Sequence, residues 1–168
     1  MDITFILLRV VHILSGIFWV GSAVLMAAFI TPAARALGPD GGKFMQFLLG
    51  KLRLSNTISL SAILTTLAGI VLYWRDSAGL QTMWIFSSTG SLLTVGAVAG
   101  ILAAILGGAV TAPTAARMDA LSKQMQAGGG PPKPEQLAQL QKLQMQLGQA
   151  GVWGAVLLVI SAAAMALA

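Results

Sequence analysis

Four long apolar stretches alternate with shorter polar segments along the chain. They cover residues about 4–30, 55–74, 84–112 and 148–168, and each has the roughly 20 residues that a helix needs to cross a bilayer core. A helix also satisfies its own backbone hydrogen bonds in lipid. The pattern therefore predicts an all-α, polytopic transmembrane four-helix bundle, with residues 1–168 forming a single integral membrane domain.

Amphipathic patterns extend the last two helices beyond the membrane. Leucine and methionine recur at helical spacing on both sides of "AGGGPPKPEQ", and Pro134 followed by Glu135 favours a helix start. We expect helices over about 84–126 and 134–168, joined by a turn at about 127–133, to form a cytoplasmic helical hairpin. Simple packing of a long loop would explain this hairpin, and so would docking of a partner.

Two segments of the chain resemble each other. "TPAARAL" ends the first helix and "APTAARMDAL" the third, which aligns Arg35 with Arg117 and, within one residue, Pro32 with Pro113. The glycines and proline of residues 38–42 are turn signals that break the chain after the first helix. The likeness suggests a duplicated two-helix hairpin, whose copies are parallel repeats because each enters and leaves on the same side.

Composition agrees with a membrane protein, since 57% of the residues are hydrophobic and 9% charged. The net charge of +5 does not indicate a nucleic-acid partner, because the basic residues are not gathered into one surface. Most lie in the loops after the first and third helices: Arg35, Lys43, Lys51, Arg53, Arg117, Lys123, Lys133 and Lys142. The positive-inside rule then places both loops in the cytoplasm and both termini outside. The expected location is the bacterial cytoplasmic (inner) membrane, with the lipid bilayer as a partner.

Soluble-enzyme chemistry is not indicated. The chain has no cysteine, which excludes disulfides and thiolate metal sites. The five acidic residues lie in loops or at ends: Asp2, Asp40, Asp76, Asp119 and Glu135. We predict no catalytic residue, and the absence of charge deep in the later helices also disfavours a transporter or channel.

Small residues recur every four positions in the third helix, at Gly96, Gly100, Ala104 and Gly108. Such a ridge lets a neighbouring helix backbone approach closely in lipid. We predict that it packs against another helix of the bundle, and a homodimer would use the same feature.

Polar residues form a stripe on each of the first two helices. In the first helix Arg9, His12, Gly16 and Trp19 are spaced by three and four residues, and in the second the stripe holds Asn56, Ser59, Thr66 and Tyr73. Polar groups avoid lipid, so the two stripes are expected to face each other. A structural histidine with a satisfied N–H is one interpretation of His12, and a lipid-headgroup anchor is the simplest role for Arg9.

The second interpretation is a haem site. A neutral imidazole such as His12 is a common axial ligand of haem iron, and an arginine such as Arg9 can pair with a propionate. Gly16 would give a flat macrocycle room, and Trp19 would wall the pocket. This interpretation makes His12 the metal ligand to haem iron, with haem b as the cofactor.

The stretch "HILSGIFWVG", with a histidine early in the first helix and a following W-x-G, resembles a superfamily of small bacterial membrane proteins. The superfamily includes the copper-resistance D domain, the HemJ-type protoporphyrinogen oxidases and integral membrane families of the DUF2269 kind. Its members are helical bundles, and several are associated with haem b or electron transfer. The resemblance implies His12 as haem ligand, with Arg9 and Trp19 as pocket residues.

Two functions follow as expectations. One is a haem-binding membrane protein with a role in electron transfer or porphyrin handling through His12. The position that matches His12 in the third helix falls near Leu93 or Thr94, so a methionine, a water or the histidine of a second copy would complete the coordination. The alternative is a non-catalytic accessory or assembly subunit of a larger membrane complex, which would use the glycine ridge and the hairpin as docking surfaces.

Overall fold

The computed structural model describes residues 2–128 and 131–168, which hold helices and no strand. In chain order the elements are α1 (Ile3–Leu25), η1 (Met26–Ile30), α2 (Thr31–Ala36), α3 (Pro39–Gln46), η2 (Phe47–Lys51), α4 (Leu54–Asp76), α5 (Thr82–Ile85), α6 (Ser88–Leu106), η3 (Gly107–Thr111), α7 (Ala112–Ala127) and α8 (Pro134–Ala166), where η denotes a π-helix. The predicted all-helical class is confirmed.

Four continuous helices are long and apolar enough to cross a membrane, as predicted: Ile3–Ala36, Leu54–Asp76, Ser88–Ala127 and Pro134–Ala166. They indicate a multi-pass membrane protein. The third begins at Ser88, after the short helix α5, four residues later than the expected start at 84. Part of the expected turn at 127–133 lies outside the described residues, between the end of α7 at Ala127 and the start of α8 at Pro134.

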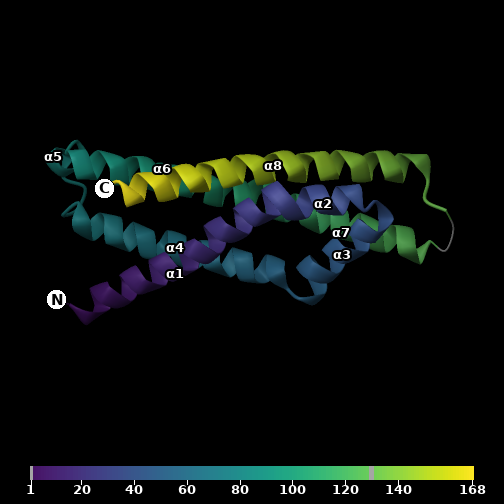
Figure 1. Cartoon of the computed structure of the whole chain (residues 1–168), viewed down its shortest axis with the longest axis horizontal. Coiled ribbons are helices and arrows are strands. Elements are labelled where there is room, and N and C mark those ends of the chain that lie inside the picture. The colour runs from purple at the N-terminus through teal and green to yellow at the C-terminus, as the bar shows by residue number, and fades with distance from the viewer. Residues whose placement is uncertain (1, 129–130) are drawn as a thin grey trace.

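The long helices run along the length of the molecule (Figure 1). Their contacts form a closed ring. α1 packs mainly on α4 and α6 mainly on α8, while α1 also contacts α8 and α4 also contacts α6. Both termini and α5 lie at one end of the molecule, whereas α2, α3, the end of α7 and the start of α8 lie toward the other (Figure 1). Each pair of long helices is therefore an antiparallel hairpin.

All four helices meet at one buried cluster. Trp19 of α1, Ala103 of α6 and Leu158 of α8 form its centre, and Ile58 and Ala62 of α4 pack against them. In lipid such packing, and not the hydrophobic effect, holds helices together. The cluster is thus the point where the two hairpins are joined.

One part of the predicted glycine ridge packs against α8. A Cβ at Gly96 would stand 3.1 Å from the Ser161 carbonyl oxygen, and one at Gly100 would stand 3.1 Å from Ser161 Oγ. The hydroxyl of Ser161 donates to the carbonyl of Gly96 at 2.7 Å, so α8 lies directly on this part of the ridge. Gly108, at the far end of the ridge, has no packing neighbour within 4 Å among the described residues.

Two π-helical turns interrupt long helices before a proline. Thr31 N–H bonds to Met26 O just ahead of Pro32, and Ala112 N–H bonds to Gly107 O just ahead of Pro113. Proline has no N–H and its ring crowds the carbonyl four residues earlier, so the wider turn lets the helix continue. Both long helices therefore run on past their prolines.

One helix was not expected. The turn signals at residues 38–42 do break the chain at Gly38, where φ is +58°, but α3 and η2 follow directly and continue to Lys51. A Cβ at Gly41 would collide with the carbonyl oxygen of Ala34, so α3 turns back tightly against α2. The predicted break therefore lies at Gly38, whereas the helix that follows it was not predicted from the sequence.

Candidate functional site

His12 lies between α1 and α4. Its Nδ1 is 2.8 Å from the carbonyl oxygen of Thr65. A carbonyl can only accept a hydrogen bond, so Nδ1 carries the proton and donates. In the neutral ring Nε2 is then an unprotonated acceptor with a free lone pair.

The imidazole ring packs against Gly69 of α4, where the absence of a side chain leaves a notch in the helix surface. A Cβ at Gly69 would stand 2.8 Å from His12 Cε1 and 3.1 Å from His12 Nδ1. Any larger residue would push the ring from this position. Gly69 therefore determines how closely α1 and α4 approach around His12.

A short chain of hydroxyl groups completes the contact. Thr65 Oγ1 donates to Ser15 Oγ at 2.7 Å, and the buried Ser15 hydroxyl donates in turn to the carbonyl of Val11. Among the described residues no buried side-chain N or O atom lacks a hydrogen-bond partner. We call His12, Ser15, Thr65 and Gly69 the α1–α4 clasp.

We expect Gly69→Ala to loosen the α1–α4 clasp. The added methyl group would stand inside contact distance of the His12 ring, and overpacking of this kind costs about 1–3 kcal/mol. Gly16→Ala is the matched control, because its Cβ would stand 3.5 Å from Thr65 Cγ2, an ordinary contact, and alanine favours the helix by up to about 1 kcal/mol. The unfolding free energies of both variants in bicelles test this prediction. Equal changes in Gly69→Ala and Gly16→Ala would contradict the packing described.

The four residues of the predicted haem site lie in three places. His12 and Gly16 both face Thr65 of α4. Trp19 is only 7% exposed and packs in the four-helix cluster. Arg9 is exposed toward the N-terminal end of α1, where its Cζ lies 4.3 Å from the centre of the Phe5 ring.

The polar stripes predicted on α1 and α4 do not pair as expected, because the predicted stripe on α4 contains the wrong residues. The α4 residue that bonds to α1 is Thr65 and not its neighbour Thr66, while Asn56 and Ser59 are exposed. Tyr73 shares a hydrogen bond of 2.6 Å with Thr94 of α6. The sequence signal for Thr65 is the glycine four residues later, which lies on the same helix face and provides the notch.

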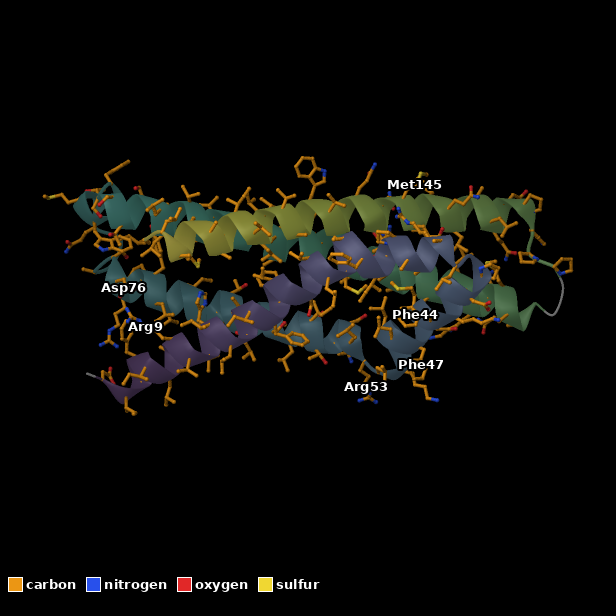
Figure 2. The ribbon with its side chains drawn as sticks, viewed as in Figure 1. Arg9, Phe44, Phe47, Arg53, Asp76 and Met145 are labelled. Carbon is orange, nitrogen blue, oxygen red and sulfur yellow. The ribbon has the colours of Figure 1, made fainter. Side chains whose placement is uncertain are left out.

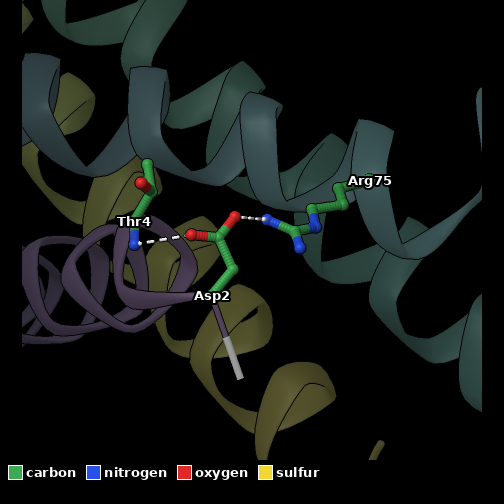
Figure 3. Close-up of polar contacts among 3 residues, drawn as sticks. All are labelled: Asp2, Thr4 and Arg75. Carbon is green, nitrogen blue, oxygen red and sulfur yellow. Dashed lines mark hydrogen bonds and ion pairs between the residues drawn. The ribbon is translucent and has the colours of Figure 1, made fainter.

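A second polar contact joins α1 to α4 near the N-terminus of the chain (Figure 3). Asp2 caps α1, since its Oδ1 accepts from Thr4 N–H at 3.0 Å, and its Oδ2 accepts from Arg75 Nη1 at 3.1 Å. Arg75 also lies 4.5 Å from the Phe5 ring centre. The Thr4 N–H first, and then the Arg75 guanidinium, hold the pKa of Asp2 below its ordinary value of 3.8.

This shift predicts a pH dependence that Asp2→Asn removes. Because the folded pKa is lowered, the stabilisation is present above pH 3.8 and is lost as the pH falls through the folded value. Asparagine keeps the helix cap but not the ion pair. The difference in unfolding free energy between wild type and Asp2→Asn should therefore shrink on acidification below this pH, and a constant difference would contradict the assignment.

Within residues 2–128 and 131–168 no group of three or more His, Cys, Asp or Glu side chains could hold a metal ion. No family model, curated protein or solved structure matches the chain.

Proposed function

We propose that this chain is a non-catalytic accessory or assembly subunit of a larger complex in the bacterial inner membrane. The α1–α4 clasp and the Trp19 cluster hold its four helices together, and glycines on its outer surface receive a helix of another subunit. The basic loops would lie in the cytoplasm and both termini outside.

The observation that carries the proposal is a set of glycines without packing neighbours. No neighbouring group among the described residues lies within 4 Å of the Cβ position at Gly21, Gly107, Gly108 or Gly151. Glycine inside a helix is about 1 kcal/mol less favourable than alanine. A close-packed helix from another subunit would offset that cost, because small residues let helix backbones approach closely. We call these four residues the open glycines.

The poor covering of α1 supports the same proposal. In α1 only Ser15 and Trp19 are buried, and the span Ile3–Ala36 is the least buried of the four. Gly21 lies on this helix. A partner helix on α1 would bury part of the surface that the bundle leaves open.

The matched π-turns support the proposed duplication. Each turn begins six residues before its proline, at Met26 before Pro32 and at Gly107 before Pro113. Such a match is expected if two copies of one hairpin inherited the same break. Parallel repeats favour a static bundle over alternating-access transport, which fits an accessory role.

The test measures the mass of the particle extracted from native membranes. We expect wild type to migrate in a particle heavier than one 17.3 kDa chain, and Gly21→Leu or Gly108→Leu to release the single chain. Val152→Leu, on an exposed position of α8, is the control and should leave the particle intact. A mass of two chains would identify a second copy as the partner, and a wild-type mass of one chain would contradict the proposal.

Haem binding through His12 is the second candidate, and the tautomer of His12 favours it. Histidine ligands of metals commonly donate their other N–H to a backbone carbonyl, as His12 does to Thr65. Nε2 is the atom that would bind iron, and the bound haem b would supply one-electron chemistry. The other predicted pocket residues fit less well, because Gly16 packs on Thr65 and Trp19 on the four-helix cluster.

Haem titration of the purified protein tests this candidate. A Soret band that saturates in wild type and is lost in His12→Ala would support it. Circular dichroism must show that His12→Ala retains its helices. An equal titration of wild type and variant would rule out His12 as the ligand.

A further inference from the structure

The segment between the first two membrane spans is a helix whose outer side is both aromatic and basic. α3 and η2 together run from Pro39 to Lys51. Phe44 and Phe47 are each nearly half exposed, at 46% and 48%. Lys51 Nζ lies 5.6 Å from the centre of the Phe47 ring. We call α3 and η2 the connecting segment.

The connecting segment ends at the level where α4 begins its membrane span. α4 starts at Leu54 and its 23 residues correspond to about 34 Å of helix, close to the thickness of a bilayer core. Arg53 directly precedes α4, and Arg75 is the second-last residue of α4. The end of the connecting segment is therefore placed at the lipid headgroups, and Phe47 and Arg53 lie at the rim of the molecule away from α8 (Figure 2).

Two positive charges of this region are not neutralised. Lys43 pairs with Asp40 at 2.9 Å. Neither Lys51 nor Arg53 has a carboxylate partner within residues 2–128 and 131–168. Arg53 is held in the left-handed region, with φ of 54°, an uncommon conformation for an arginine. The surface thus offers aromatic rings together with two free cations.

We propose that the connecting segment is an interfacial helix that binds anionic phospholipid headgroups. Phe44 and Phe47 enter the boundary between headgroups and acyl chains, while Lys51 and Arg53 contact lipid phosphates. Aromatic side chains with basic neighbours are typical of helices that lie in this plane. The tight turn at Gly41 fixes the direction in which the segment returns from α2 to the membrane.

Membrane contact is tested by depth-dependent quenching. The chain has no cysteine, so a single cysteine can carry an environment-sensitive fluorophore in the full-length protein. In nanodiscs with spin-labelled lipid we expect quenching at Phe47→Cys to lie between that at Leu67→Cys, exposed within α4, and that at Leu137→Cys, exposed in the first turn of α8. Quenching at Phe47→Cys no stronger than at Leu137→Cys would overturn the proposal and leave the surface to an acidic protein partner.

Headgroup selectivity is tested by lipid charge. We expect quenching at Phe47→Cys to increase when phosphatidylglycerol is added to phosphatidylcholine. Lys51→Gln with Arg53→Asn should remove this increase, since each basic residue near an anionic surface favours the bound state roughly fivefold. The control is Asp40→Asn with Lys43→Gln, which removes a charge pair without changing net charge and should respond as wild type. Equal responses of both double variants would overturn the selectivity.

Discussion

Gly96→Leu is expected to separate α6 from α8 and to destabilise the protein by about 3 kcal/mol or more. The new side chain would meet Met165 Cγ at 2.9 Å and the Ser161 carbonyl at 3.1 Å already at its Cβ. Overpacking costs about 1–3 kcal/mol, and the hydrogen bond from Ser161 to Gly96 O would be lost as well, at about 0.6 and at most about 1.7 kcal/mol. The measurement is the unfolding free energy in bicelles.

Gly108→Leu is the control for Gly96→Leu. It lies on the same ridge of the same long helix but has no packing neighbour within 4 Å among the described residues. We expect the isolated chain to keep its stability in this variant. Similar losses of unfolding free energy in the two variants would contradict the described difference in packing between Gly96 and Gly108.

Trp19→Ala is the second substitution with a large expected effect. Trp19 fills the point where all four helices meet, and truncation of a buried tryptophan typically costs about 3–5 kcal/mol. Part of this cost in soluble proteins is the free energy of transferring the side chain out of water, and that part is small for a helix in lipid. We therefore expect about 3 kcal/mol from the cavity and the lost contacts. The measurement is again the unfolding free energy in bicelles.

Trp153→Ala provides the matched control for Trp19→Ala. Trp153 lies on α8 and is 64% exposed, so its removal opens no cavity inside the bundle. A small effect is expected. If Trp153→Ala destabilised the chain as much as Trp19→Ala, the assignment of Trp19 as the central packing residue would be contradicted.

The membrane spans were predictable because they depend only on apolar length, which the sequence displays directly. Helical spacing also correctly placed His12 and Gly16 on one face toward the second span. The same spacing put Trp19 on that stripe, but a tilted helix meets different neighbours along its length, and Trp19 reaches the four-helix cluster. Helical periodicity identifies the residues that share one face of a helix. It does not identify the helix that packs against that face.

Two other features could not be predicted for physical reasons. Thr65 and Thr66 differ by one position, about 100° around the helix, and the closeness of the α1–α4 contact at Gly69 decides which one bonds. The Pro39–Asp40 pair fits both a turn and a helix start, because proline at the first position and an acid in the first turn favour a helix. The contact of Gly41 with Ala34, which selects the helix, is visible only in three dimensions.

The central claim is that the chain is a non-catalytic accessory subunit in which His12 packs α1 against α4 and binds no haem. The most direct test is the reduced-minus-oxidised absorption spectrum of the full-length protein, isolated from its native membranes with haem supplied during expression. We predict a folded, colourless wild type, in which His12→Ala lowers the unfolding free energy by about 1–2 kcal/mol through loss of the Thr65 hydrogen bond and ring packing. A haem spectrum in wild type that disappears in a folded His12→Ala variant would contradict the claim and establish His12 as a ligand.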